Sequence, residues 1–260
     1  MITVLSWNVL SDAYVRPGYF PHTEPALLAP GVRTPRILAR LVALTPDVIC
    51  LQEAEPALFE ALVAALAPLG FVGRFTQKRG KPDGCATFVR RGTLEVESFQ
   101  EIAYADGGPD RPDSGHVALL AVVRASGTRI GIANTHLKWD DPGTPDEARW
   151  ATRQIPWLFA ATSSTHTRVP WILCGDFNVT PDSPVHGQIT GAGYVDAYAT
   201  LPGALTSNAN EDAKRIDYLF HAPELRLTPV PIPPIGDQTP LPSESEPSDH
   251  LAIAARVSLR

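Results

Sequence analysis

Apolar runs and helical repeats alternate along the first part of the chain. Ile2–Asn8 alternates apolar and polar residues and Asp47–Gln52 is a short apolar run with β-branched residues, so both predict strands. Between them, apolar residues recur at helical spacing through Thr34–Leu44, with Thr34 expected as the N-cap and Pro35 at the first helical position. The order strand, helix, strand is typical of an α/β protein.

The middle of the chain is rich in predicted strands, which suggests sheets packed face to face. Further helices are expected over Pro56–Leu66 and Glu147–Ala161, where Pro156 should introduce a kink. Further strands are expected over Phe71–Phe75, Cys85–Arg90, Leu94–Ile102, Val117–Arg124, Arg129–Thr135, Val169–Cys174, Ile216–His221, Leu227–Val230 and Leu251–Val257. Ile235–Ser248 should be a long loop. No Gly/Ser linker divides the chain, so residues 1–260 are expected to form one domain.

Composition narrows the class of protein. The 260 residues are 44% hydrophobic and 19% charged, which suits a globular chain and argues against disorder. Lys and Arg number 22 against 28 Asp and Glu, a net charge of −6. No broad basic surface is therefore expected to hold duplex nucleic acid by counterion release. A polyanionic substrate would have to be met locally, through a bound cation.

The sequence predicts neither export nor a membrane partner. The chain has no basic start followed by an apolar core, and its most apolar stretch, Pro56–Gly70, is too short to span a bilayer. Cys50, Cys85 and Cys174 each lie in an apolar run without CxxC spacing. They are expected to be buried reduced thiols, which indicates a cytoplasmic location.

Residues that can bind a cation or move a proton recur at the carboxyl ends of the predicted strands. They are Asn8, Glu53, His136, Asp176 and Asn178. Strand ends that deliver such residues into loops are the usual location of an active site built on a sheet. Asp176 and Asn178 lie two apart, so both side chains would face the same way in an extended segment.

Asp217 is expected inside a strand, where a buried carboxylate needs a partner. His250 is the expected partner, because a carboxylate at one ring nitrogen fixes the tautomer and raises the basicity of a histidine. The alternative is a structural ion pair between Asp217 and Arg215 or Lys214.

Six short motifs occur in an order and spacing that resemble the endonuclease/exonuclease/phosphatase superfamily, which includes DNase I. They are Trp7-Asn8, Leu51-Gln52-Glu53, Thr135-His136, Gly175-Asp176-Phe177-Asn178, Ile216-Asp217-Tyr218 and Ser248-Asp249-His250. The stretches SWNVLSDAYV, PDGCATFVRR and NTHLKW are similar to the branch of carbon-catabolite-repression-type deadenylases, nocturnin and angel proteins. The resemblance implies a DNase I-like α/β fold, a four-layer sandwich of two mixed β-sheets flanked by helices.

The resemblance also implies a metal centre. Glu53, with Asn8 nearby, would hold the principal Mg²⁺, which Mn²⁺ could replace. Asp249 would serve a second metal or its water shell. Magnesium prefers oxygen ligands and usually takes one or two carboxylates.

The other matched residues would act on the phosphate and on water. The resemblance implies that His136 contacts a phosphate oxygen and that Asn178 positions the phosphate. Asp176 would orient or deprotonate the attacking water or protonate the leaving oxygen. His250, paired with Asp217, would stabilise the charge that develops on phosphorus. The general base is left open between these groups.

Three further residues are candidates for substrate contact. Lys138 would share a face with His136 if the strand continued, and Trp139 could stack a base or pack over its loop. Arg215 lies two residues before Asp217. Leu205–Lys214 contains no aromatic residue, which weakens the case for poly(A) specificity.

These observations predict a Mg²⁺-dependent hydrolase of phosphodiester or phosphomonoester bonds in RNA ends or nucleotides, acting by in-line attack of water. It could be a 3′-exoribonuclease of the deadenylase kind or a nucleotide or RNA-terminal phosphatase. The expected partner is a single-stranded RNA end or a nucleotide. The alternatives are a phosphoinositide or sphingomyelin phosphoesterase, a DNA-repair nuclease, and a non-catalytic binding module.

Overall fold

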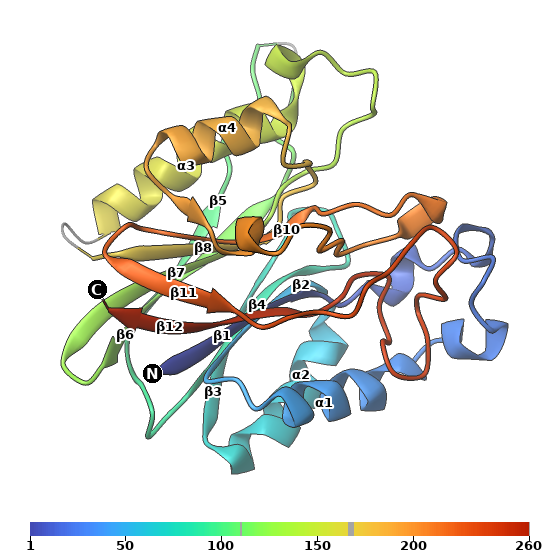
Figure 1. Ribbon diagram of the computed structural model, residues 1–260, viewed down its shortest axis with the longest axis horizontal. Helices are drawn as coiled ribbons and strands as arrows, with labels where there is room; N and C mark the ends of the chain where they lie inside the picture. Colours follow the sequence, from blue (N-terminus) through green and yellow to red (C-terminus); the bar gives the residue numbers. More distant parts are fainter. Residues whose placement is uncertain (110, 166–168, 260) are drawn as a thin grey trace.

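Two six-stranded β-sheets packed face to face form the centre of the protein in a computed structural model that describes residues 1–109, 111–165 and 169–259 (Figure 1). The first sheet has the order β11 (Leu225–Pro229), β12 (Ile253–Leu259), β1 (Ile2–Asn8), β2 (Val48–Ala54), β4 (Gly84–Arg90) and β3 (Phe71–Gln77). The second has the order β5 (Glu95–Ala103), β6 (Val117–Ala125), β7 (Thr128–His136), β8 (Trp171–Asp176), β10 (Asp217–His221) and β9 (Val195–Asp196). Both sheets mix parallel and antiparallel neighbours.

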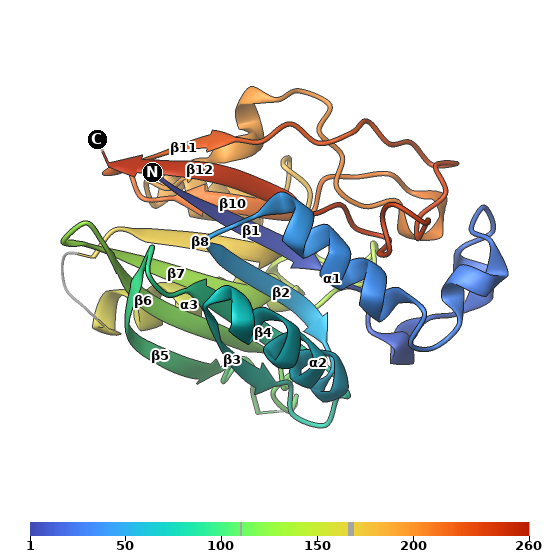
Figure 2. The same ribbon diagram turned by 90° about the horizontal axis from the view of Figure 1, so that it is seen from below.

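Helices cover the outer face of each sheet. α1 (Arg33–Leu44) and α2 (Pro56–Leu66) lie on the first sheet, and α3 (Trp150–Thr165) and α4 (Pro184–Gly191) on the second (Figures 1 and 2). Short 3₁₀ helices occupy Asp12–Tyr14, Pro17–Tyr19, Pro25–Leu28, Ala67–Leu69, Asp146–Ala148, Ala197–Thr200 and Ala209–Glu211. The predicted four-layer sandwich is confirmed. Within the described ranges, no helix combines the length and apolar character needed to cross a bilayer.

The runs of consecutive apolar residues in the strands are explained by burial of both faces of each sheet. In β1, Leu5 and Trp7 pack in one cluster with Leu41 of α1, on the outer side of the first sheet. Val4 points the other way and belongs with Ile172 of β8 to the cluster between the sheets. Strands covered on both sides need apolar residues at consecutive positions, which is the pattern in the sequence.

Two helix predictions need correction at their starts. α1 begins at Arg33 after Val32, which makes no side-chain cap, so Thr34 lies inside the first turn and is not the N-cap. The Arg33 side chain is buried against backbone carbonyls, and this anchor fixes where the helix starts. α3 begins at Trp150, later than predicted, because Arg149 is extended after a 3₁₀ turn. Pro156 lies inside α3.

The sequence pattern did not predict two elements near the end of the second sheet, and several strands begin or end at other residues than predicted. α4 and the two-residue β9 lie between β8 and β10. β12 starts at Ile253, where it pairs with Ser6 of β1, and not at Leu251. β11 spans Leu225–Pro229 because Leu225 pairs with Leu259 at the far end of β12. The expected long loop between β11 and β12 is present.

The sheet register brings the predicted strand ends together. β1 runs parallel to β2, with Asn8 opposite Gln52, and β7 runs parallel to β8, with His136 opposite Asp176. β10 is antiparallel to β8, so its first residue, Asp217, also lies opposite Asp176. Carboxyl ends of parallel neighbours meet at one edge of a sheet, and here the edges of the two sheets adjoin.

Candidate active site

Asp176 is the central residue of the cluster at this edge. It is 2% exposed, and Asn8, from the other sheet, donates from Nδ2 to its Oδ2 over 3.0 Å. The same Asn8 nitrogen donates to Glu53 Oε1, also over 3.0 Å. His136 Nε2 and His250 Nε2 lie 3.6 and 3.8 Å from Asp176 Oδ2. Four predicted site residues, Asn8, Glu53, His136 and His250, therefore adjoin the Asp176 carboxylate or its partner Asn8.

Glu53 lies at a local irregularity near the end of β2. Its φ is +56°, and the pairing of β2 with β4 shifts register between Leu51 and Ala54. The carboxylate accepts from Asn8 and, through Oε2, from the backbone N–H of Ser11 at 2.9 Å. Burial raises the pKa of Glu53; Lys78 opposes this rise and the negative charge of Asp249 adds to it. Glu53 is thus a buried carboxylate close enough to both Lys78 and Asp249 to feel their charges.

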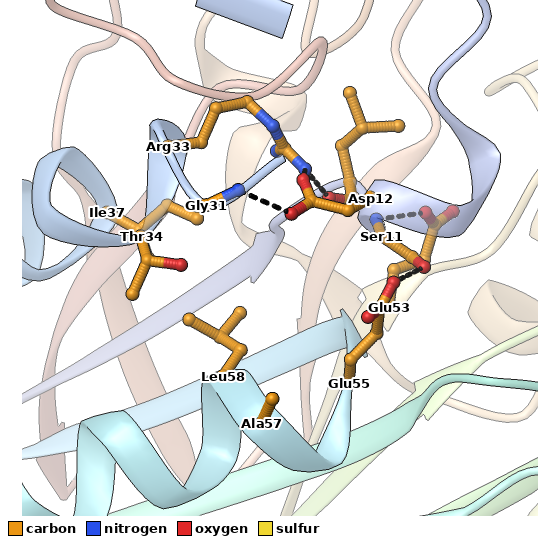
Figure 3. Close-up of a pocket in the computed structure, with 11 residues that line it drawn as sticks. Ser11, Asp12, Gly31, Arg33, Thr34, Ile37, Glu53, Glu55, Ala57 and Leu58 are labelled. Carbon is orange, nitrogen blue, oxygen red and sulfur yellow. Dashed lines mark hydrogen bonds and ion pairs between the residues drawn. The ribbon is translucent and has the colours of Figure 1, made fainter. Parts of the chain in front are cut away.

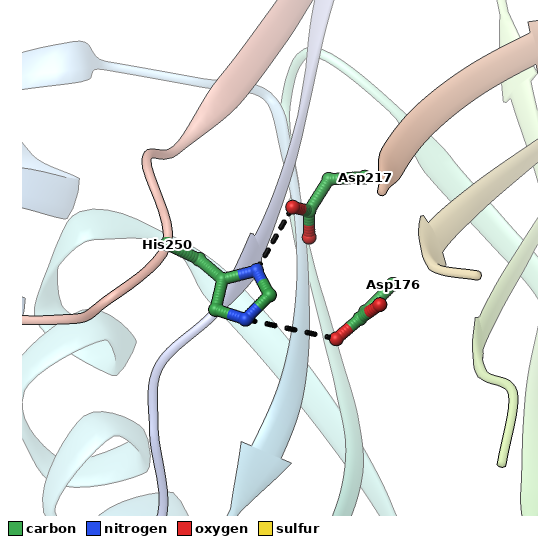
Figure 4. A group of neighbouring side chains, drawn as sticks. All are labelled: Asp176, Asp217 and His250. Carbon is green, nitrogen blue, oxygen red and sulfur yellow. Dashed lines mark hydrogen bonds and ion pairs between the residues drawn. The ribbon is translucent and has the colours of Figure 1, made fainter. Parts of the chain in front are cut away.

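Asp217 and His250 form the predicted pair. Asp217 Oδ2 lies 2.8 Å from His250 Nδ1, and both side chains are buried (Figure 4). Burial alone would lower the pKa of His250, but Asp217 outweighs it and the pKa is raised well above its usual value. His250 is therefore an imidazolium whose Nε2–H faces Asp176. The alternative ion pair is wrong, because Lys214 pairs with Asp212.

Backbone contacts hold the end of the long loop in place. Ser248 Oγ donates to the carbonyl of Asn8 over 2.7 Å, and Trp7 Nε1 donates to the carbonyl of His250 over 2.8 Å. Asp249 lies between these two anchors and is 6% exposed. The loop thus delivers Asp249 and His250 to the end of β1.

Burial sets the ionisation of Asp176. It raises the pKa of Asp176 to about 7, with a further rise from Asp217, while the positive charge of His250 and the hydrogen bond from Asn8 act in the opposite direction. A carboxylate with a pKa near neutrality can both accept and release a proton at physiological pH.

Asn178 reaches the site by a turn that the sequence pattern did not predict. β8 ends at Asp176, and Asn178 has φ of +53°, so the expectation of an extended segment is wrong. Its backbone N–H donates to Asp176 Oδ1 at 2.9 Å, and its Nδ2 donates to the Leu137 carbonyl at 2.8 Å. Asparagine tolerates this left-handed conformation better than most residues. The turn places Asn178 Nδ2 3.1 Å from His136 Nε2.

Two site neighbours, Lys78 and His116, were not among the predicted catalytic residues. Lys78 Nζ lies 3.0 Å from His136 Nδ1, and the His116 ring meets the His136 ring edge-on at 5.9 Å. Both belong to segments without a recognised motif, although Lys78 shortly precedes PDGCATFVRR. Burial, then Lys78, lower the pKa of His136 well below its usual value.

The three substrate-contact candidates are placed differently from one another. β7 ends at His136, so Lys138 does not continue its face; Lys138 Nζ lies 5.1 Å from the centre of the Trp150 ring. Arg215 pairs with Asp196 at 2.8 Å and does not line the groove beside Asn178, which corrects its expected role. Trp139 is 52% exposed, more than a ring packed over its loop would be.

An open groove of about 450 Å³ adjoins Asn178. Trp139 forms part of its wall, together with Arg149 and Lys214, and Pro184 and Val185 at the start of α4 line the other side. Arg149 and Lys214 are paired with Asp146 and Asp212 of the same groove, so the exposed indole next to Asn178 is the feature suited to a nucleotide, by stacking on its base.

A second, smaller cavity of about 160 Å³ lies behind Glu53 (Figure 3). Its polar side chains face one another: Arg33 pairs with Asp12, and Ser11 bonds to Glu55. Arg33 also donates to the Val9 carbonyl at 2.7 Å and to the Pro247 carbonyl at 3.1 Å. Through these two bonds Arg33 connects the loop after β1 to the loop before Ser248, so the residues around this cavity have a structural role.

Two groups of side chains fit a cation. In the part of the chain that the structure describes, ligand atoms of Asp176, Asp217 and His250 all lie within 4.8 Å of one another (Figure 4). That trio already contains the His250–Asp217 bond. Glu53 and Asp249 offer carboxylate oxygens, and burial raises the pKa of Glu53, so a divalent cation would stabilise its ionised form.

The chain matches the endonuclease/exonuclease/phosphatase family over residues 5–250. It therefore belongs to this family, as the ordered motifs predicted, and the expectation of a hydrolase acting on ester bonds is confirmed.

Relatives by sequence lie in the predicted branch. The chain is 25% identical to Homo sapiens 2′,5′-phosphodiesterase 12 over 312 residues, 97% of this chain and 51% of that protein. It is 30% identical to Danio rerio protein angel homolog 2 over 198 residues, 71% and 34% of the two chains. Drosophila melanogaster nocturnin is 27% identical over 307 residues, 99% and 47% of the two chains. The chain spans about half or less of the length of these relatives.

Solved structures share the fold. ANGEL2, described as a 2′,3′-cyclic phosphatase in complex with adenosine-2′,3′-vanadate, superimposes with a TM-score of 0.87 at 23% identity, covering 99% of this chain and 95% of that one. The human nocturnin catalytic domain with bound sulfate superimposes with a TM-score of 0.77 at 24% identity, covering 100% and 93%.

Proposed function

We propose that this protein is a Mg²⁺-dependent phosphoesterase that hydrolyses phosphate esters of single-stranded RNA ends or nucleotides by in-line attack of water. The observation that carries the proposal is the Asp176 carboxylate, which the register of two sheets places among Asn8, His136 and the His250–Asp217 pair. Relatives in the same family branch include a 2′,5′-phosphodiesterase and nocturnin, which supports this class of substrate.

Glu53, Asn8 and Asp249 would hold the divalent cation, with Mn²⁺ as a substitute for Mg²⁺. When bound, the cation would neutralise negative charge on the phosphate and favour attack at phosphorus. The raised pKa of Glu53 supports this assignment, because a cation would stabilise the ionised carboxylate. The amide of Asn8 links the metal side of the site to Asp176 through its two hydrogen bonds.

The remaining site residues would transfer protons or stabilise negative charge. Asp176 orients the attacking water and accepts its proton, for which a pKa of about 7 is suited. The imidazolium of His250, held by Asp217, stabilises negative charge on the phosphate as water adds and the leaving oxygen departs. His136 and Asn178 hold further phosphate oxygens through their nitrogen atoms, which lie 3.1 Å apart.

The substrate class follows from the groove and from charge. A net charge of −6 does not favour long-range capture of duplex DNA or of an anionic membrane. The groove offers the exposed ring of Trp139, whereas its Arg149 and Lys214 are paired with Asp146 and Asp212 and supply no excess of positive charge. This arrangement suits one or a few nucleotides whose base stacks on Trp139. Lys138 is proposed to act only indirectly, through Trp150.

A second candidate is hydrolysis of a terminal 2′,3′-cyclic phosphate. Protein angel homolog 2 is among the more similar relatives at 30% identity, and the ANGEL2 structure is described as that of a 2′,3′-cyclic phosphatase.

We further propose that residues 1–260 work as one catalytic domain. The buried free thiols of Cys50, Cys85 and Cys174 support the expectation of a reducing cytoplasm.

Product analysis tests the proposal. The protein is incubated with Mg²⁺ and labelled polyadenylate, mixed-sequence RNA, RNA ending in a phosphate or 2′,3′-cyclic phosphate, and NADPH. Released mononucleotides would identify an exonuclease, inorganic phosphate a phosphatase, and an opened cyclic phosphate the second candidate. Asp176→Asn is the inactive control. Turnover of only phosphoinositide, sphingomyelin or abasic DNA would overturn the proposed substrate class, and no turnover of any ester would indicate a binding module.

A further inference from the structure

Lys78 is a buried cation beside the proposed phosphate site. It follows β3 and is 3% exposed. Its Nζ lies 2.6 Å from Asp83 Oδ2, and its backbone N–H donates to the Asp83 carbonyl at 2.9 Å. Tyr14 donates its hydroxyl proton to the other Asp83 oxygen at 2.7 Å. The ion pair with Asp83 thus fixes the Lys78 ammonium group at this position.

The same ammonium group determines which nitrogen of His136 carries a proton. Lys78 Nζ lies 3.0 Å from His136 Nδ1. An ammonium has three N–H donors and no acceptor, so Nδ1 must accept the hydrogen bond and cannot itself be protonated. A neutral imidazole with an unprotonated Nδ1 carries its proton on Nε2. Lys78 therefore selects one tautomer of a neutral ring.

On the opposite side of the ring, the neighbour of Nε2 at 3.1 Å is Asn178 Nδ2, an amide nitrogen with two N–H groups, one of which bonds to the Leu137 carbonyl. The ring must keep a proton on one nitrogen, so it cannot accept from both Asn178 and Lys78, and the charged ammonium at 3.0 Å is the stronger donor. Asp176 Oδ2 is farther, at 3.6 Å. Two N–H donors thus lie side by side at the edge of the site, an arrangement that receives an anionic oxygen. The perpendicular ring of His116, at 5.9 Å, packs against His136 and limits its rotation.

We propose that Lys78 is a positioning residue that fixes His136 as a neutral Nε2–H donor to a phosphate oxygen. The proposal rests on the phosphoesterase function proposed above. It also assigns different roles to the two histidines: His250 faces the carboxylate of Asp217 and is charged, whereas His136 faces an ammonium and is neutral. A neutral donor can bind the phosphate oxygen and release the product without the added attraction of a full positive charge.

The ring protonation is measured directly by NMR of protein labelled with ¹⁵N-histidine. His136 signals are assigned by their loss in His136→Gln. The wild-type protein is expected to show a protonated Nε2 and an unprotonated Nδ1 for His136. A protonated Nδ1, alone or together with Nε2, would overturn the proposal. This readout needs no turnover, so it decides the inference even if the proposed phosphoesterase function fails.

Variants test the role of the lysine. Lys78→Met removes the donor but leaves Asp83 buried without its partner, so Lys78→Met/Asp83→Asn is made as well to remove both charges together. Lys81→Met is the matched control, because Lys81 is an exposed lysine in the same segment. In the Lys78 variants the His136 tautomer is expected to become mixed, and kcat should fall about 10–100-fold. KM should change much less.

The outcomes separate a positioning role from a merely structural one. A folded double variant with a mixed His136 tautomer and a lower kcat, beside an unaffected Lys81→Met, is the expected result. A double variant whose His136 keeps the Nε2–H tautomer, or whose kcat equals that of wild type, would overturn the proposal.

Discussion

Asp217 Oδ2 and His250 Nδ1 lie 2.8 Å apart although 33 residues separate them in the chain. Asp217 opens β10 opposite Asp176, and His250 arrives at the end of the long loop, held by the Trp7 indole. The other Asp217 oxygen is buried without a hydrogen-bond partner, so His250 is the cationic partner of the Asp217 carboxylate. This pair makes His250 the cationic group of the site.

Replacing the Asp217 carboxylate by an amide should remove the positive charge of His250. Asp217→Asn is expected to lower kcat by about 10²–10⁴-fold, because His250 would lose its positive charge and its fixed tautomer. Steady-state kinetics on the substrate found by product analysis provides the measurement.

The matched control for Asp217 is another Asp–His pair, outside the site, in which the aspartate is buried. His186 Nε2 lies 3.2 Å from Asp196 Oδ2, and Asp196→Asn should leave kcat close to the wild-type value even if it lowers stability. Equal kcat losses in Asp217→Asn and Asp196→Asn would contradict a specific role for the His250 pair.

The metal assignment predicts a thermal shift. At a Mg²⁺ concentration about 100 times its Kd, the folded state gains about 2.7 kcal/mol, which raises Tm by roughly 5–10 °C. Differential scanning fluorimetry of chelator-treated protein measures this shift, with KCl of matched ionic strength as the salt control.

Glu53→Gln should abolish the Mg²⁺ shift, whereas Glu60→Gln, an exposed acid on α2, should keep it. A full Mg²⁺ shift in Glu53→Gln would place the cation elsewhere, for example at the Asp176, Asp217 and His250 trio.

Trp139 is expected to contribute binding and not chemistry. Its ring is 52% exposed in the groove beside Asn178, and loss of base stacking costs about 1–3 kcal/mol, or roughly 5- to 150-fold in KM. Trp139→Ala should therefore raise KM for a nucleotide substrate with little change in kcat. Trp157→Ala is the control, since Trp157 is 45% exposed on α3 and does not line that groove. An unchanged KM in Trp139→Ala would rule out base stacking on this ring.

The strand-end residues could be predicted from the sequence because their signal is local. A polar residue directly after an apolar run marks the end of a strand. The parallel pairing of β1 with β2 then places Asn8 opposite Gln52, and that of β7 with β8 places His136 opposite Asp176. The partner of Asp217 could be predicted for a different reason, since a buried carboxylate requires a charged or donating neighbour.

Other parts of the site depend on backbone geometry and tertiary contacts that no local pattern encodes. The left-handed conformation of Asn178 replaces the extended segment expected after Asp176. Lys78 reaches His136 only because β3 and β7 belong to different sheets that face each other. Arg215, a predicted substrate contact, pairs instead with Asp196, a tertiary contact in which His186 of α4 also takes part.

His116 should affect stability at acid pH. Burial and the charge of Lys78 lower its pKa to about 3, below the usual 6.5, so the unfolded chain binds a proton that the folded protein excludes. Its contribution to stability is complete above about pH 6.5 and is lost as the pH falls towards 3, at up to about 1.4 kcal/mol per pH unit.

Urea unfolding at pH 7.5 and pH 5 measures the effect of His116. His116→Phe keeps a ring against His136 but cannot titrate, so it should lose less stability between the two pH values than wild type. Identical losses in the two proteins would mean that His116 is protonated in the folded state.

The most direct measurement of the central claim is hydrolysis of bis-p-nitrophenyl phosphate by wild type and Glu53→Gln. We expect wild-type turnover that a chelator abolishes and Mg²⁺ restores. Glu53→Gln should be slower by about 10²-fold or more at the same Mg²⁺ concentration. A Glu53→Gln protein with the full metal-dependent rate of wild type would contradict the account.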